Sequence, residues 1–168
     1  MNLYKKKICV ISSSRSEIGI LKNLIYQLND DNFFLNKIIS LDDHKISSKF
    51  SKKKDELQDF NKKDIYSIKL SKRIDKPIDI INRSSDILKK LSKIFIKEKF
   101  ELIILLGDRY EILISAYTSI LHKVPIVHIS GGDETIGSYD NNFRHAISKF
   151  ANFHFVTNKD SKRRLIMM

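Results

Sequence analysis

Short apolar runs alternate with amphipathic stretches along the chain. Short, β-branched apolar runs indicate buried strands, whereas apolar residues spaced three and four apart indicate one face of a helix. Strands are predicted at residues 7–12, 33–41, 65–70, 101–107, 125–129 and 152–156. Helices are predicted at residues 17–28, 78–99, 110–122 and 141–151, and from residue 158 onward. This alternation predicts an α/β fold with a Rossmann-like, doubly wound parallel sheet.

The length and composition of the chain fit one domain. It has 168 residues, of which 42% are apolar, and this is enough for a packed core. Neither an internal repeat nor a linker divides it, so residues 1–168 are expected to form a single domain. Residues 42–63 are polar and rich in lysine, which predicts an exposed loop with a short helix near residues 55–60.

The single cysteine and the apolar runs suggest a location. Cys9 lies inside an apolar run, where a thiol behaves as a small hydrophobe, and one cysteine forms no internal disulfide. A reducing, cytoplasmic setting is therefore expected. The N-terminal apolar stretch is too short for a signal peptide, and no uncharged run is long enough to span a bilayer, so no membrane partner is expected.

The formal net charge of +11 invites a nucleic-acid interpretation. Most of the 31 basic residues, however, are lysines, whereas arginine is preferred for bidentate phosphate recognition. The aromatic residues lie mostly within apolar runs and offer no platform for base stacking. The composition favours a solvated lysine surface over a nucleic-acid site, and it stays compatible with an anionic small molecule such as a nucleotide.

Polar residues follow three of the predicted strands, at residues 12–17, 107–111 and 130–134. Ligands of doubly wound sheets bind beyond the carboxyl ends of the strands, so the three clusters are expected at one edge. The first leads into a helix, whose N-terminus together with Arg15 suits an anion. The alternative is that Ser14 or Ser16 caps the helix and Arg15 lies in solvent. No dinucleotide fingerprint or P-loop is present, and no cofactor is predicted.

The other two clusters carry carboxylates. Asp108 is predicted either to act as an acid or base in a cleft, with Arg109 as its fixed partner, or to cap the next helix. In the third cluster a glycine pair permits a sharp turn and close approach of a ligand. Three carboxylates, Asp133, Glu134 and Asp140, surround that loop. They suggest acid–base work or a metal, and because their spacing matches no familiar ligand set, no metal site is predicted.

The histidines near these clusters allow two interpretations. His128 lies within a predicted strand and faces one side of the sheet, which favours a structural histidine. Arg144 and His145 lie in the first turns of a predicted helix. His145 follows Asp140 by five residues, so about one turn of helix would bring both near the cleft. The alternative is that these side chains form an exposed polar face.

Three segments together resemble a known family. They read Gly-Asp-Arg-Tyr-Glu at residues 107–111, Val-Pro-Ile-Val-His-Ile-Ser-Gly-Gly-Asp at residues 124–133, and Asp-Asn-Asn-Phe-Arg-His-Ala-Ile-Ser-Lys at residues 140–149. In this order they resemble the hydrolysing UDP-N-acetylglucosamine 2-epimerases of sialic and legionaminic acid synthesis. Residues 12–17 resemble the first-strand loop of these enzymes. The Arg-His-Ala-Ile-Ser-Lys stretch favours the hydrolysing branch over the non-hydrolysing one, which has Gly-Asp-Thr and Val-Glu-Ala-Gly instead.

The resemblance implies two Rossmann-like domains in a GT-B arrangement, with the active site between them, in a homo-oligomer. It implies that UDP leaves a UDP-sugar by elimination across C1–C2 and that water adds to the glycal-like intermediate, giving N-acetylmannosamine or a related 2-epimer. Asp108 and Asp140 match proton-transfer carboxylates of the family, and Arg15 matches the arginine near the nucleotide phosphates. Further catalytic candidates are Asp133 and Glu134, and further substrate-binding candidates are Arg109, Gly131, Gly132, Arg144 and His145.

Two features depart from the family pattern. Ser130 stands where the animal and some bacterial members carry an acidic residue, so either Asp133 or Glu134 replaces that function or the substrate differs, as in enzymes acting on a diacetamido-bacillosamine nucleotide. The chain resembles only the N-terminal half of the family, so the C-terminal nucleotide-binding domain is expected to be absent and the chain to be inactive alone. Two alternatives are the acceptor-side half of a GT-B glycosyltransferase and a basic nucleic-acid-binding module.

Overall fold

The structure is a computed structural model and describes residues 5–41, 57, 59–71 and 76–168. The short helix expected near residues 55–60 lies mostly outside the described residues. The described strands are β1 (Lys6–Ser12), β2 (Phe34–Ser40), β3 (Ile65–Ser67), β4 (Leu102–Leu106), β5 (Ile126–Ile129) and β6 (Phe153–Phe155). The described helices are α1 (Arg15–Asp30), the 3₁₀ helix η2 (Lys62–Asp64), α2 (Pro77–Glu98), α3 (Tyr110–Leu121), α4 (Asp140–Phe150) and α5 (Lys159–Met167).

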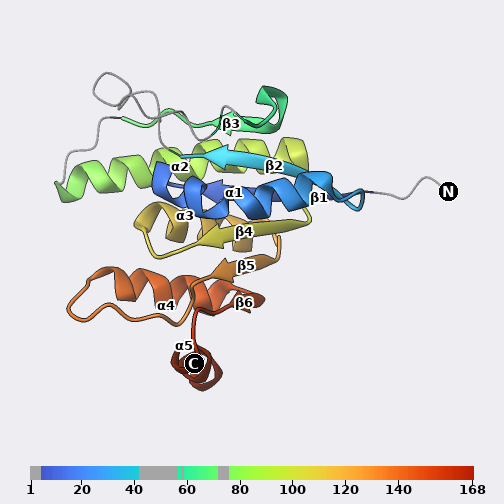
Figure 1. Ribbon diagram of the computed structural model, residues 1–168. Coiled ribbons are helices and arrows are strands. Elements are labelled where there is room, and N and C mark those ends of the chain that lie inside the picture. The colour runs from blue at the N-terminus through green and yellow to red at the C-terminus, as the bar shows by residue number, and fades with distance from the viewer. Residues whose placement is uncertain (1–4, 42–56, 58, 72–75) are drawn as a thin grey trace.

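The described strands form one sheet in the order β3-β2-β1-β4-β5-β6, and each neighbouring pair is parallel (Figure 1). The strand order reverses between β1 and β4. This is the doubly wound topology in which ligands bind outside the carboxyl ends of the strands at the reversal point. The predicted fold class is therefore confirmed.

Both faces of the sheet are buried. Along β1, Cys9 and Ile11 belong to one apolar cluster, and Ile8 and Val10 belong to the other. Successive strand residues point to opposite faces, so this division follows from the period of two. Helices α2, α3 and α4 contribute side chains to the first cluster, and α1 contributes to the second. Helix α5 lies beyond the β6 edge of the sheet (Figure 1).

Helix ends differ from the predictions in instructive ways. Helix α1 begins at Arg15, two residues early, because Ser14 is its N-cap and its hydroxyl accepts a hydrogen bond from the Glu17 amide. Pro77 is the first residue of α2, where its missing amide hydrogen costs nothing. The alternative prediction that Asp108 caps α3 is wrong, since the N-cap of α3 is Arg109 and its side chain makes no capping hydrogen bond.

Candidate functional site

The three predicted polar clusters lie at the same edge of the sheet, because β1, β4 and β5 are consecutive neighbours in the strand order. Backbone hydrogen bonds continue past the strand ends and hold these loops together. The Gly107 amide donates to the Ile129 carbonyl at 3.2 Å, so the loop after β4 is tied to the end of β5. This hydrogen bond holds the loop after β4 in place relative to β5 at the candidate site.

A buried carboxylate organises the loop after β1. Glu17 is 8% exposed, and its oxygens accept hydrogen bonds from the Ser13 amide at 2.6 Å, the Ser13 hydroxyl at 2.7 Å and the Ser12 hydroxyl at 3.1 Å. This role was missed in the sequence. The spacing of Ser14 and Glu17 resembles a capping box, but Glu17 reaches past the cap to the end of the strand. It fixes the loop that carries Arg15, which is partly buried.

Asp108 forms its ion pair with Arg144, not with the expected Arg109. Arg144 is buried, and it also donates to the Asp133 carbonyl at 2.7 Å and to the side-chain oxygen of Asn141 at 3.1 Å. The backbone after β4 turns Arg109 toward the buried carboxylate of Glu111, 3.3 Å away. The structure thus joins the loop after β4 to helix α4 through one charge-assisted contact.

His128 lies fully buried in β5 and makes two hydrogen bonds. Its Nε2 atom is 2.8 Å from the Gly107 carbonyl oxygen, and its Nδ1 atom is 3.1 Å from the Ser148 hydroxyl. Burial lowers the pKa of His128 to about 4, although the hydrogen bond to Gly107 opposes this. A carbonyl oxygen only accepts, so Nε2 carries the proton and Nδ1 accepts from Ser148. This geometry agrees with the structural histidine that the sequence favours.

The glycine pair after β5 is required by packing within the protein. A Cβ atom on Gly131 would lie 2.8 Å from His128 Nδ1 and 3.0 Å from the Ser148 hydroxyl. Gly132 has a φ of +76°, and a Cβ atom there would lie 2.5 Å from the Ser161 carbonyl oxygen. The predicted sharp turn is present, and the close approach is made by residues of the chain itself.

A polar pocket of about 580 Å³ lies between the loop after β5 and the start of α5. The Asp133 carboxylate faces α5 and accepts from the hydroxyls of Thr157 and Ser161, each at 2.5 Å. Glu134 is paired with Arg164 at 2.9 Å and approaches His145 at 3.9 Å. Lining residues are Asp133, Glu134, Thr135, Ile136, Arg144, Asn158, Asp160, Ser161 and Arg164. This pocket therefore adjoins the Asp108–Arg144 pair on one side and α5 on the other.

Asp140 is the first residue of α4 and is exposed. It precedes Arg144 by four residues, so both lie on one helix face. The structure thus brings Asp108 and Asp133 into contact with Arg144, and separately brings Glu134 near His145, with Asp140 one helical turn from Arg144. Within the described residues, no group of three or more His, Cys, Asp or Glu side chains is arranged to hold a metal ion.

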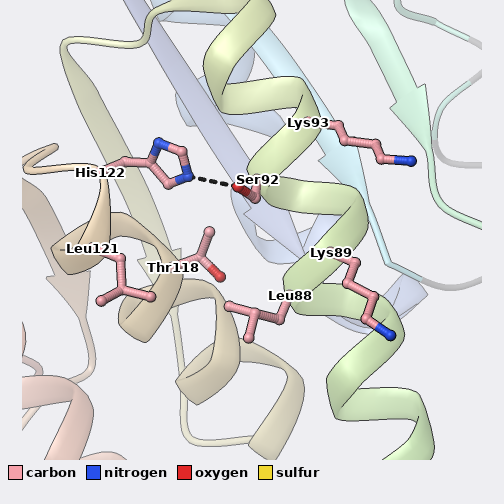
Figure 2. A pocket seen from close by; sticks show the side chains of 7 residues that line it. All are labelled: Leu88, Lys89, Ser92, Lys93, Thr118, Leu121 and His122. Carbon is pink, nitrogen blue, oxygen red and sulfur yellow. Dashed lines mark hydrogen bonds between the residues drawn. The ribbon is translucent and has the colours of Figure 1, made fainter.

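A second pocket, of about 440 Å³, lies between α2 and α3 (Figure 2). It is lined by Leu88, Lys89, Ser92, Lys93, Thr118, Leu121 and His122. Its side chains include a second histidine–serine pair, with His122 Nε2 2.9 Å from the Ser92 hydroxyl. His122 follows the C-terminal end of α3, whereas the candidate site adjoins the N-terminal end of that helix. None of the predicted site residues lines this pocket.

The fold and the site together define a class. A doubly wound domain with a serine-rich helix N-terminus and a carboxylate–arginine pair at the carboxyl ends of its strands is suited to an anionic ligand and to proton transfer. Among the helices in the described part of the chain, none has the length and apolar character needed to cross a membrane.

Sequence comparison identifies the family. The model of the UDP-N-acetylglucosamine 2-epimerase family matches residues 27–168. A curated relative from Campylobacter jejuni, GDP/UDP-N,N'-diacetylbacillosamine 2-epimerase (hydrolyzing), is 32% identical over an alignment of 170 residues that covers 98% of this chain and 42% of that protein. Polysialic acid biosynthesis protein P7 of Escherichia coli is 28% identical over 97% of this chain and 41% of its own length. The chain belongs to the UDP-N-acetylglucosamine 2-epimerase family.

Solved structures confirm the fold. UDP-GlcNAc 2-epimerase from Neisseria meningitidis, crystallised with UDP-GlcNAc, superposes with a TM-score of 0.81 at 18% identity and covers 96% of this chain. The enzyme from Methanocaldococcus jannaschii, crystallised with UDP-GlcNAc and UDP, gives a TM-score of 0.79 at 19% identity over 96% of this chain. This chain spans 42% and 43% of those two chains. It spans about two-fifths of the curated relatives reported above.

Proposed function

We propose that this chain supplies the N-terminal domain of a hydrolysing nucleotide-sugar 2-epimerase. The contact between Asp108 and Arg144 carries the proposal. It joins the Gly-Asp-Arg segment to the Arg-His-Ala-Ile-Ser-Lys segment, which lie 36 residues apart and both resemble the hydrolysing branch. The name of the Campylobacter jejuni relative, which describes a hydrolyzing enzyme, supports the same branch.

In this mechanism Arg15 and the N-terminus of α1 hold the diphosphate of a UDP-sugar, since the positive end of a helix dipole and a cation suit an anion. A base removes the proton from C2, its electron pair forms the C1–C2 double bond, and the C1–O bond breaks with its electrons leaving on UDP. Water then adds its oxygen to C1, and a proton returns to C2. Inversion at C2 requires proton transfer on two faces of the sugar, which suits two carboxylates, Asp108 and Asp140.

Contacts rank the remaining carboxylates. Asp133 and Glu134 are engaged with α5, through two hydroxyls and through Arg164 respectively. Asp140 is exposed at the start of α4, and Asp108 is partly exposed, with a side chain 23% accessible. These differences support Asp108 and Asp140 as the proton-transfer pair. They support a binding role for Arg144, whose guanidinium orients Asp108.

The substrate is an N-acetylated sugar linked to UDP. Ser130 in place of an acidic residue, together with the name of the Campylobacter jejuni relative, favours a diacetamido sugar over N-acetylglucosamine. Parallel assays with UDP-N-acetylglucosamine and UDP-N,N'-diacetylbacillosamine test this choice. A higher kcat/KM for UDP-N-acetylglucosamine would contradict it.

A C-terminal domain completes the active site, because the chain spans 42% of the Campylobacter jejuni relative. The test joins this chain to the C-terminal part of that relative, which gives a reconstituted enzyme. Release of UDP together with the free 2-epimer is expected from the reconstituted enzyme and not from the chain alone. Turnover by the chain alone at the rate of a complete enzyme would refute the need for a second domain. Absence of turnover in both, with UDP-sugar binding retained, would refute the epimerase assignment.

The proposal includes a homo-oligomer. Large apolar side chains are exposed on α2 and α3, including Ile81 at 61%, Ile96 at 66% and Leu121 at 57%, and where such side chains form one contiguous patch they mark an interaction site. Light scattering after size-exclusion chromatography measures the mass directly, and a monomeric mass of the reconstituted enzyme would contradict the proposed homo-oligomer.

The nucleic-acid alternative has its own test. A steeply salt-dependent mobility shift of DNA or RNA by this chain would support that alternative instead.

A further inference from the structure

His128 is one member of a closed ring of contacts that links Gly107 and Asp108 to Arg144 and Ser148 of α4. Its Nε2–H donates to the carbonyl of Gly107, the residue directly before Asp108. Its Nδ1 atom accepts from Ser148 on α4. Ser148 follows Arg144 by four residues on the same helix, and Arg144 pairs with Asp108. The imidazole therefore connects the residue that precedes Asp108 to the helix that carries its partner, Arg144.

The residues packed around the His128 imidazole restrict it to one orientation. A Cβ atom on Gly131 would overlap both His128 Nδ1 and the Ser148 hydroxyl, so the chain reserves this space for the histidine contact. Gly107 has a φ of +86°, a conformation that favours glycine and that sets the direction of its peptide group. Burying an imidazole is costly unless both nitrogens are satisfied, and here both are.

We propose that His128 is a positioning residue for Asp108. It holds the Gly107 carbonyl at a fixed distance from α4, and this sets where the Asp108 carboxylate meets Arg144 and, beyond it, the sugar. The inference rests on the proposed function, since it assigns Asp108 to proton transfer. His128 acts only through the backbone and contacts no substrate.

Two variants distinguish the His128 contact with Gly107 from its contact with Ser148. His128→Gln places an amide nitrogen near the Nε2 position, so it retains the donor to Gly107 and loses the acceptor for Ser148. His128→Asn places an amide oxygen near the Nδ1 position, so it retains Ser148 and loses Gly107. The matched control is His122→Asn, which breaks a histidine–serine contact of similar length in the pocket between α2 and α3 (Figure 2).

Steady-state kinetics of the reconstituted enzyme give the first measurement. His128→Asn is expected to lower kcat roughly 100-fold with KM changed less than about 3-fold, because a shift near 1 Å at a reacting group costs that much. His128→Gln is expected to stay within about 10-fold of the parent enzyme, and His122→Asn near the parent value. Equal losses of kcat in His128→Asn and His128→Gln would overturn the proposal.

NMR of this chain gives the second measurement, which needs no activity. The ¹³C shifts of the Gly107 carbonyl and the Asp108 carboxyl are expected to move in His128→Asn and to stay close to the parent values in His128→Gln. His122→Asn moves neither. If the reconstituted enzyme proves inactive, the proposed function fails, while these shifts still decide whether His128 positions Asp108. An unmoved Asp108 carboxyl in His128→Asn overturns the positioning role.

Discussion

Acidification below neutral pH should destabilise the folded chain through His128. In the fold, burial holds the pKa of this histidine at about 4, whereas its ordinary value is 6.5. As the pH falls through 6.5, the unfolded chain takes up a proton on His128 that the folded chain does not bind. The unfolded state therefore gains stability over this window, and the loss ends once the pH passes the folded-state pKa near 4.

The size of this effect follows from the pKa difference. One unit of pKa corresponds to about 1.4 kcal/mol, so His128 alone lowers the free energy of unfolding by about 3 kcal/mol between pH 6.5 and pH 4. Typical domains have about 5 to 15 kcal/mol in total, so the loss is a substantial fraction of the stability. His128→Gln lacks a titrating group and is expected to lose correspondingly less.

Urea denaturation followed by far-UV circular dichroism measures both chains from pH 7.5 to pH 4. Contributions from groups common to both chains largely cancel when the two pH profiles are subtracted. The difference profile should be flat above pH 7 and should reach about 3 kcal/mol near pH 4. Parallel profiles would show that His128 titrates alike in the folded and unfolded states, and this would refute its burial as a neutral group.

Three other predictions concern the same edge of the sheet. Glu17→Gln removes the acceptor charge from three hydrogen bonds, so urea denaturation should show a loss of about 2 kcal/mol in the free energy of unfolding. Calorimetry should also show weaker UDP binding. An unchanged stability would argue against a stabilising role of Glu17 in the loop after β1. Asp108→Asn leaves the buried guanidinium of Arg144 uncompensated, so the free energy of unfolding should fall by about 2 kcal/mol. UDP release by the reconstituted enzyme should stop, and retained turnover would exclude Asp108 as a proton-transfer group. Gly131→Ala should lower the free energy of unfolding in thermal denaturation by about 2 kcal/mol, because the added Cβ atom overlaps His128. Gly19→Ala in α1 should stabilise the chain by about 0.5 to 1 kcal/mol, because nothing lies within 4 Å of a Cβ atom there. Equal effects of the two variants would exclude the overlap at Gly131.

The fold could be predicted because its signal is local. Each central strand is a continuous apolar run, and the covering helices repeat their apolar residues at helical spacing. The edges were harder to predict. The strand expected at residues 65–70 ends at Ser67 in β3, and the short strand β6 has exposed side chains throughout. Edge strands have one neighbour, so their lengths depend on pairing with that neighbour and not on apolar pattern alone.

The place of the site could be predicted, whereas its contacts could not. The rule for doubly wound sheets brings Asp108 to the carboxyl ends of the strands together with the other clusters. The sequence predicts its neighbour Arg109 as the partner, yet the backbone directs that side chain to Glu111. The actual partner, Arg144, comes from a helix 36 residues away. Ion pairs of this kind depend on how elements pack, and a single sequence carries no direct record of packing.

The three segments that resemble the epimerases turn out to be parts of one connected structure. The first supplies the Gly107 carbonyl and the Asp108 carboxylate, the second supplies His128, and the third supplies Arg144 and Ser148. A change in one segment therefore alters contacts of the other two.

Ser130, the departure from the family pattern, lies beside this ring. Its backbone amide donates a hydrogen bond to the Phe155 carbonyl oxygen at 2.9 Å, on the β6 side of the sheet. Its φ of +63° places it in the left-handed region, where the cost of the conformation depends on the side chain. The two ring hydrogen bonds of His128 are to Gly107 and Ser148, so a change of side chain at position 130 is expected to leave both bonds in place. We expect such a change to alter the surface of the loop after β5 without moving Asp108.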